Sequence, residues 1–156
     1  MIKFLVIDVD GTLTDGKIYF SERGEVFKAF NVKDGLGLKE IAVNNGITPI
    51  VITARQSKFV TLRMKELGIK HVYQGVSNKL LFLKCLANEL GADFSEMAYI
   101  GDDVNDLECM EACGISACPS DSVSQIKLVV DYVCKQNGGE GAVREFIDEL
   151  ISKRRL

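Results

Sequence analysis

Residues 4–12 read Phe-Leu-Val-Ile-Asp-Val-Asp-Gly-Thr, and this stretch decides the fold class. Its leading apolar residues suit a strand that is buried on both faces, as in a parallel sheet covered by helices. The run stops at Asp8, and Gly11 favours a turn. Residues 47–53 repeat the pattern as Ile-Thr-Pro-Ile-Val-Ile-Thr. Both strands therefore end in polar side chains, which a parallel sheet brings to the same edge.

Strand-like and helix-like segments alternate through the rest of the chain. Strands are expected at 3–9, 47–53, 72–73, 97–100, 115–117 and 131–134. Helices are expected at 34–45, 56–67, 78–90, 103–113, 122–128 and 141–154. Glycine, a common residue at helix ends, follows four of these helices at Gly46, Gly68, Gly91 and Gly114. The alternation predicts an α/β fold with a Rossmann-like central parallel sheet flanked by helices.

Residues 17–30 interrupt this alternation. They read as two aromatic-rich strands around a Ser-Glu-Arg-Gly turn, which predicts a β-hairpin inserted after the first strand. The hairpin carries Tyr19, Phe20, Phe27 and Phe30. An isolated hairpin is only marginally stable in water. It therefore either folds back on its own domain or packs against other subunits, and we expect the second.

The composition excludes several classes of protein. The chain has 156 residues, 47% of them apolar and 26% charged, which suits one globular domain over residues 1–156 and excludes disorder. A net charge of −3 offers no general attraction to nucleic acid or to an anionic membrane. No apolar run approaches the ~20 residues of a membrane span, and none suits a signal peptide, so a cytoplasmic protein is expected. The odd number of cysteines, 5, favours reduced thiols.

Charge is unevenly distributed along the chain. Residues 79–156 carry 14 Asp and Glu against 8 Lys and Arg, whereas residues 1–78 carry 8 against 11. Much of the acidic excess lies just after the apolar strand at 97–100. Asp8, Asp10 and Asp102 follow neighbouring strands, and their carboxylates would repel one another unless a cation neutralised them. A ligand set made only of oxygen favours Mg²⁺.

Four motifs, taken in order, resemble those of the haloacid dehalogenase superfamily. Asp-x-Asp-Gly-Thr stands at 8–12, and Thr53 ends the next core strand. Lys79 lies at a helix start, and Gly-Asp-Asp at 101–103 is followed by Asp106. Each motif falls at an expected strand or helix boundary. The resemblance implies a phosphatase with the fold of that superfamily.

The resemblance also assigns a role to each motif residue. It implies that Asp8 is the nucleophile that forms an aspartyl-phosphate and that Asp10 is the general acid and base. Mg²⁺ would be held by the carboxylates of Asp8 and Asp102 and by the carbonyl of Asp10. Residues implied to bind the phosphate are Thr53, Ala54 and Lys79. Residues implied to orient metal-bound waters or Lys79 are Asp103 and Asp106.

Most members of the superfamily carry a cap domain between the first and second motifs or between the second and third. Here 45 positions separate Asp8 from Thr53, and 26 separate Thr53 from Lys79. The hairpin, two helices and a strand already occupy these intervals. We therefore expect no cap domain, and another element must exclude water from the site. The hairpin at 17–30 is the candidate for that element.

A capless member with such a hairpin resembles the family of 3-deoxy-D-manno-octulosonate 8-phosphate phosphatases. The matching segments are 10–16, 32–37, 99–103 and 138–145. The family implies a homotetramer whose hairpins associate beside the active sites, and an acidic 2-keto-3-deoxy sugar phosphate as substrate. It also implies that the Gly-rich stretch and final helix at 138–156 can reach a neighbouring active site. The alternative for that stretch is a flexible linker.

Related families share this architecture, so the resemblance does not decide which sugar phosphate is the substrate. Nonulosonate (sialic acid or KDN) 9-phosphate phosphatases share the architecture and tend to carry Glu at the position of Arg55. An Arg there suits a substrate with a carboxylate. Lys33 stands where the octulosonate group often has Arg, and Ala54 replaces the usual Gly. Lys33 is thus either a sugar contact or a surface residue.

Two other classes of protein share part of the pattern. A non-catalytic tetramerisation domain, related to the C-terminal domains of CMP-sialate synthetases, would keep the fold. Such domains lose motif acids, however, and this chain retains Asp8, Asp10 and Asp102. A signalling receiver domain also combines an acidic cluster with a Thr and a Lys, but it has no need of Asp10. The phosphatase interpretation is preferred.

Overall fold

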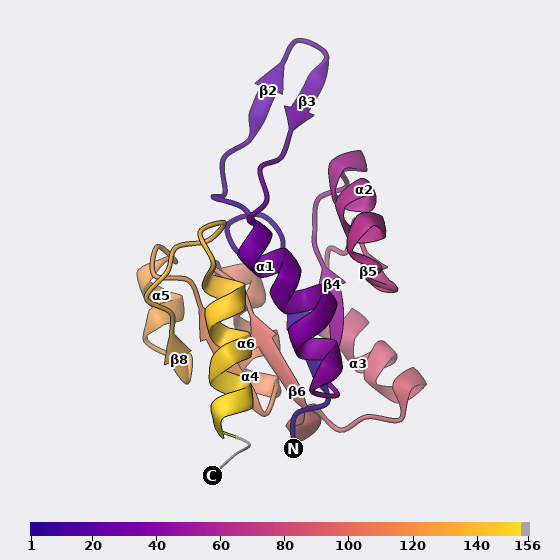
Figure 1. Ribbon diagram of the computed structural model, residues 1–156, viewed down its shortest axis with the longest axis vertical. Coiled ribbons are helices and arrows are strands. Elements are labelled where there is room, and N and C mark those ends of the chain that lie inside the picture. Colours follow the sequence, from indigo (N-terminus) through magenta and orange to yellow (C-terminus); the bar gives the residue numbers. More distant parts are fainter. Residues whose placement is uncertain (154–156) are drawn as a thin grey trace.

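The computed structural model describes residues 1–153 of the chain. Its centre is a six-stranded sheet in the order β5-β4-β1-β6-β7-β8, in which every neighbouring pair is parallel (Figure 1). The strands are β1 (Phe4–Ile7), β4 (Thr48–Ile52), β5 (His71–Tyr73), β6 (Met97–Ile100), β7 (Ile115–Cys118) and β8 (Tyr132–Val133). The predicted α/β class with a central parallel sheet is confirmed.

Helices cover both faces of this sheet. One face is covered by α1 (Val32–Leu36), which continues into a π-helix η1 (Gly37–Ala42), and by α2 (Lys58–Leu67) and α6 (Ala142–Ser152). The other is covered by α3 (Lys79–Leu90), α4 (Leu107–Ala112) and α5 (Ser124–Lys127). Two 3₁₀ turns, η2 (Phe94–Glu96) and η3 (Val104–Asp106), complete the helical elements of the described chain.

Successive residues of β1 point to opposite faces of the sheet. Leu5 and Ile7 pack with apolar residues of η1, α2 and α6, whereas Val6 packs with apolar residues of α3, α4 and α5. All three side chains are fully buried. Burial on both faces explains why β1 is continuously apolar instead of alternating.

The predicted segments agree in type with the structure and differ at their ends. β1 stops at Ile7, two residues before the predicted end, because the Val9 carbonyl accepts N–H groups of the turn that follows. The helix predicted to begin at residue 34 begins at Val32, where the Asn31 side chain accepts a hydrogen bond from the backbone and caps it. Residue 154, predicted to end the last helix, lies outside the described residues.

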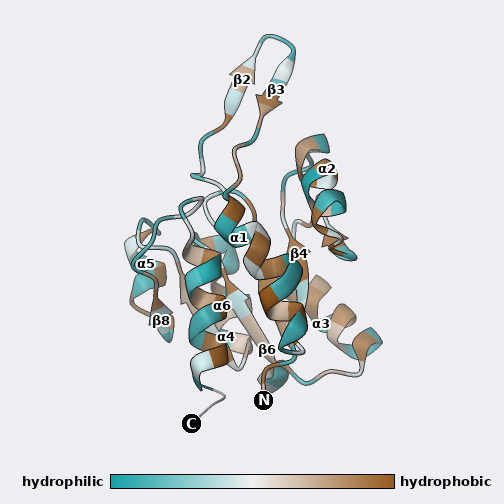
Figure 2. Ribbon diagram, viewed as in Figure 1, coloured by the Kyte–Doolittle hydropathy of each residue, from teal (hydrophilic) through white to brown (hydrophobic). Residues whose placement is uncertain are grey.

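The predicted hairpin is present as β2 (Tyr19–Ser21) and β3 (Gly24–Phe27), which pair antiparallel. It projects beyond the carboxyl end of the sheet and forms a separate two-stranded sheet (Figure 1). The Tyr19 and Phe27 rings stack at 4.3 Å. The hairpin includes hydrophobic residues (brown in Figure 2), and three of them, Phe20, Val26 and Phe27, are exposed, Phe20 to 73%. The hairpin therefore presents apolar surface that its own chain does not cover.

The intervals that hold cap domains elsewhere are short here. Between β1 and β4 lie only the hairpin, α1 and η1, and between β4 and β5 lies only α2. The predicted lack of a cap domain is confirmed. Across residues 1–153, the helices are also too short or too polar for any of them to cross a membrane.

Candidate active site

Most of the predicted site residues meet at the carboxyl ends of β1, β4 and β6. They line a cavity of about 260 Å³. The lining residues are Asp8, Asp10, Thr53, Ala54, Arg55, Asp102, Asp103, Val104 and Asn105. The structure therefore brings these residues together at the edge of the sheet where the strand-end rule for open parallel sheets expects a ligand.

A tight turn after β1 presents the first two carboxylates. The Val9 carbonyl accepts the N–H groups of Thr12, Leu13 and Thr14, and the Thr14 hydroxyl accepts the N–H of Gly11 at 3.2 Å. Gly11 has φ +88°, and a Cβ there would overlap the carboxylate of Asp102. A glycine is thus required for the turn to lie against the end of β6.

Lys79, the first residue of α3, holds two of the carboxylates. Its Nζ donates to Asp8 Oδ1 and to Asp106 Oδ1, each at 2.7 Å. The lysine is only 3% accessible. Burial lowers the pKa of Lys79, but the charges of Asp8 and Asp106 and their hydrogen bonds outweigh it, so the pKa is raised. Lys79 is therefore a permanent cation in the floor of the site.

Asp106 is fully engaged by its own chain. Its Oδ1 also accepts the Tyr99 hydroxyl at 2.7 Å, and its Oδ2 accepts the backbone N–H of Asp102 at 3.1 Å. The residue is completely buried. Its oxygens are thereby committed to orienting Lys79 and the loop after β6.

The carboxylates of Asp8, Asp102 and Asp106 crowd together, with ligand atoms within 4.8 Å of one another. Burial, followed by the charge of Asp106, raises the pKa of Asp8 to about 6, although Lys79 opposes the shift. Burial and the charges of Asp8 and Asp106 raise the pKa of Asp102 to about 8. The Lys79 ammonium does not balance three carboxylates. This donor set, made of oxygen alone and in excess of negative charge, fits a hard divalent cation.

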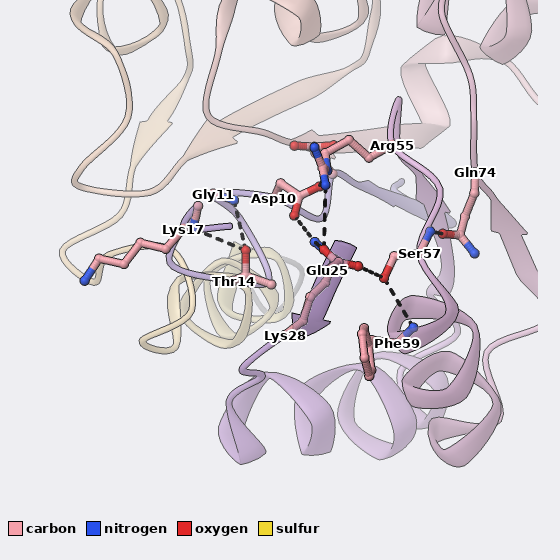
Figure 3. A network of polar contacts seen from close by, with 12 residues as sticks. Asp10, Gly11, Thr14, Lys17, Glu25, Lys28, Arg55, Ser57, Phe59 and Gln74 are labelled. Atoms are coloured by element: carbon pink, nitrogen blue, oxygen red, sulfur yellow. Dashed lines mark hydrogen bonds and ion pairs between the residues drawn. The ribbon is translucent and has the colours of Figure 1, made fainter. Parts of the chain in front are cut away.

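The Asp10 carboxylate faces the hairpin. It forms an ion pair with Lys28, which lies just after β3, and Lys28 also pairs with Glu25 Oε1 at 2.8 Å (Figure 3). Glu25 Oε2 accepts the hydroxyl of Ser57 at 2.5 Å. Burial lowers the pKa of Lys28, but its bonds to Asp10 and Glu25 raise it overall. The sequence analysis missed Lys28, Glu25 and Ser57, because none of them directly ends a strand of the main sheet.

The predicted substrate residues divide into two groups. Thr53 is buried at the end of β4, and the exposed Ala54 follows it; both line the cavity with Asp8. The Arg55 side chain, 48% accessible, stands at the mouth of the cavity with Nε 3.7 Å from Asp10 Oδ2. Lys33 lies elsewhere. It borders a different hollow that is lined largely by α6, so this chain does not bring it to its own cavity.

Asp103 caps the start of the turn η3, which follows β6. Its Oδ1 accepts the N–H of Val104 and so begins the turn η3, whose last residue is Asp106. Its side chain is exposed, and its backbone N–H points to Asp106 Oδ2 at 3.5 Å. Asp103 therefore helps to place Asp106, the residue that holds Lys79.

The Gly-rich stretch before α6 packs on the turn after β1. The N–H of Gly139 donates to the Thr12 carbonyl at 3.1 Å, and the N–H of Gly138 donates to Asp121 Oδ1 at 2.9 Å. These hydrogen bonds hold the stretch against its own chain, which does not suit a flexible linker.

Comparisons with known proteins agree with this geometry. Residues 68–147 match the family of haloacid dehalogenase-like hydrolases. The chain is 43% identical over 150 residues to the 3-deoxy-D-manno-octulosonate 8-phosphate phosphatase of Escherichia coli, covering 96% of this chain and 79% of that protein.

Solved structures extend the agreement to the fold. The phosphatase of Moraxella catarrhalis, in complex with magnesium, phosphate and KDO, superposes with a TM-score of 0.92 at 42% identity, covering 97% of this chain and 86% of that one. The cobalt-bound phosphatase of Haemophilus influenzae superposes with a TM-score of 0.94 at 38% identity, covering 99% and 90%. This chain therefore belongs to the haloacid dehalogenase-like hydrolases and, within them, to the 3-deoxy-D-manno-octulosonate 8-phosphate phosphatase family.

Proposed function

We propose that this protein is a Mg²⁺-dependent phosphatase that hydrolyses 3-deoxy-D-manno-octulosonate 8-phosphate through an aspartyl-phosphate. One observation carries the proposal: Asp8, which lines one cavity with Asp10 and Asp102, is bonded to Lys79, and Lys79 also binds the buried Asp106. This geometry supports a proposal in which Asp8 is the nucleophile, Asp10 transfers the proton and Lys79 supplies a fixed positive charge. Each of these three groups is needed for hydrolysis of a phosphate ester through a covalent phosphoryl-enzyme intermediate.

In the first half-reaction, an oxygen of Asp8 attacks phosphorus. The bond between phosphorus and the sugar oxygen breaks, and Asp10 donates a proton to that oxygen, so the sugar leaves as an alcohol. In the second half-reaction, Asp10 takes a proton from water, which attacks the phosphorus of the aspartyl-phosphate. Inorganic phosphate leaves, and the carboxylate of Asp8 is restored.

The metal ligands in this proposal are the carboxylates of Asp8 and Asp102 and the carbonyl of Asp10. Asp106 is close enough to join them, but its oxygens already accept from Lys79, Tyr99 and the backbone. When bound, the ion neutralises the carboxylates and the transferring phosphoryl group. Asp106, with Asp103 starting its turn, then serves to orient Lys79.

The phosphate and the sugar carboxylate require separate partners. Thr53 and Ala54 line the cavity, and the buried Lys79 is bonded to Asp8, which also lines it. Thr53, Ala54 and Lys79 are proposed to bind phosphate. Arg55 at the mouth is proposed to bind the substrate carboxylate. The Moraxella catarrhalis relative, crystallised with KDO and phosphate, supports a ligand of this type.

We also propose that residues 1–156 form one domain that assembles as a homotetramer through the hairpin. The exposed apolar side chains of the hairpin support this assembly, because contact with another subunit would remove them from water. In such an assembly the Lys33 of one subunit can still be a sugar contact in another. A cytoplasmic location stays a prediction.

The test is to compare kcat/KM for octulosonate 8-phosphate and nonulosonate 9-phosphate with Mg²⁺ present. A preference for the octulosonate ester, lost in Asp8→Asn while the protein stays folded, is expected. A preference for the nonulosonate ester would assign the enzyme to the related sugar. A folded wild-type protein that hydrolyses neither ester would refute the proposed activity.

A further inference from the structure

The base of the hairpin is connected to Asp10 by a continuous series of polar contacts. Ser57 caps α2 by accepting the N–H of Phe59 and donates its hydroxyl to Glu25 Oε2. Glu25 Oε1 pairs with Lys28 at 2.8 Å, and Lys28 pairs with Asp10 Oδ1. Figure 3 shows these contacts running from the start of α2, through the base of the hairpin, to Asp10 in the turn after β1.

Lys28 is buried and is held in place by two ion pairs, one with Asp10 and one with Glu25. Its side chain is 2% accessible, against 14% for Glu25 and 19% for Asp10. A lysine ammonium in so little water is costly unless carboxylates surround it, and here two carboxylates do. Removing Lys28 would therefore leave Asp10 without a fixed partner on its hairpin side.

The two oxygens of Asp10 are used differently. Oδ1 is occupied by Lys28, whereas Oδ2 lies 3.7 Å from Arg55 Nε, which is beyond hydrogen-bond distance. Oδ2 is thus the oxygen left available to exchange a proton. A carboxylate anchored through one oxygen keeps its other oxygen in a defined direction, which proton transfer to a leaving group requires.

We propose that Lys28 is a positioning residue that orients Asp10 for proton transfer, and that Glu25 and Ser57 hold Lys28 in that position. This inference rests on the proposed phosphatase function and deepens it. It assigns the hairpin a second role within its own subunit: its base supplies the group that aligns the general acid.

The test uses two phosphate esters of nearly the same shape that differ in their need for a proton. Phenyl phosphate releases a basic phenolate that benefits from a general acid, whereas p-nitrophenyl phosphate releases a stable nitrophenolate that does not. With enzyme in excess over ester, the first release of the phenol reports the Asp8 attack step alone. The variants are Lys28→Met and Glu25→Gln, and Lys17→Met is the control because its side chain is exposed and points away from Asp10 (Figure 3).

Lys28→Met is expected to slow phenol release from phenyl phosphate by roughly tenfold or more, and p-nitrophenol release by less than about twofold. Glu25→Gln should show the same selectivity with a smaller effect, and it carries the comparison if Lys28→Met does not fold. Equal losses on the two esters, or no loss on either, would refute the positioning role. A wild-type enzyme inactive on both aryl esters and on the sugar phosphate would instead refute the proposed function.

Discussion

Gly138 lies against the carbonyl of Gly11, leaving no room for a side chain between the two residues. They are far apart in sequence, yet this contact sets the C-terminal segment directly on the turn that presents Asp8 and Asp10. The neighbouring hydrogen bond from Gly139 to Thr12 fixes the same relationship. Position 138 therefore supports the turn that carries Asp8 and Asp10.

Gly138→Ala should lower both stability and activity. The added Cβ would overlap backbone atoms of Gly11, so the turn must move, at a cost of about 2 kcal/mol in the free energy of unfolding. Urea denaturation and kcat measure the two effects. Gly91→Ala is the control: Gly91 has φ +61° and open space around it, so it should lose about 1 kcal/mol with kcat unchanged. Wild-type kcat in Gly138→Ala would contradict the supporting role.

Asp34 should make the protein less stable as the pH rises. Burial raises its pKa to about 6, although N–H groups of Arg144 and Gly141 oppose the shift. Between pH 3.8, the ordinary pKa of an aspartate, and about pH 6, the folded state therefore binds more protons at Asp34 than the unfolded state does. The contribution of Asp34 to stability falls as the pH rises through this range.

Asp34→Asn removes this titration. Between pH 5 and pH 7 the unfolding free energy of the variant should gain about 1 kcal/mol relative to wild type. Denaturation of both proteins at several pH values measures the difference. A difference that stays constant across this range would show that Asp34 does not titrate as its burial indicates.

Asp106→Asn should strongly lower both the stability of the protein and kcat. The Asn side chain has one acceptor oxygen where Asp has two, so it cannot accept from Lys79, Tyr99 and the Asp102 N–H together. A buried donor therefore loses its partner, at a cost of about 1–3 kcal/mol. Lys79 would also lose its orientation, and kcat should fall roughly 100-fold or more. Glu111→Gln, an exposed change on α4, is the control and should leave kcat as in wild type.

Tyr99→Phe separates the two effects of Asp106. It removes one hydrogen bond to Asp106 but leaves the 2.7 Å contact with Lys79 in place. We expect a stability loss of about 1 kcal/mol with a smaller fall in kcat than in Asp106→Asn. A fall in kcat as large as that of Asp106→Asn would argue against orientation of Lys79 as the main role of Asp106.

Removal of Mg²⁺ with a chelator should abolish turnover, and readdition should restore it. Mg²⁺ should also raise the Tm of the wild-type protein, because an ion that binds only the folded state stabilises it. This rise should be lost in Asp102→Asn and retained in Glu108→Gln, whose carboxylate is exposed on α4. An unchanged rise in Asp102→Asn would exclude this carboxylate as a principal ligand.

Phe20→Asp tests the proposed assembly through the hairpin. Phe20 is 73% accessible in the single chain, and a charge there would be buried if hairpins associate. Sedimentation at micromolar concentration should show a shift from tetramer to smaller species. Leu128→Asp is the control, since Leu128 is 86% accessible but lies beside α5, away from the hairpin. A wild-type monomer, or a Phe20→Asp tetramer, would contradict the proposal.

The polar residues that follow the strands of the main sheet were predictable because their causes are local, although the last residue of several strands was not. An apolar run followed by an acid marks where a buried strand leaves the core, and this placed Asp8, Thr53 and Asp102 at one edge of the sheet. The hairpin was predictable for a similar reason, from aromatic runs around a turn. The position of Lys33 was not, because it depends on how α1 meets α6.

The sequence by itself determined the parallel α/β fold, the lack of a cap domain and the carboxylates gathered at the sheet edge. Only the tertiary structure decided that Lys79 holds Asp106 as well as Asp8, that Lys28 reaches Asp10, and that Gly138 packs on Gly11. The physical reason is the distance along the chain over which each cause acts. Apolar patterning and turn residues act over a few neighbouring positions, whereas these contacts join segments whose approach is set by the packing of the whole core.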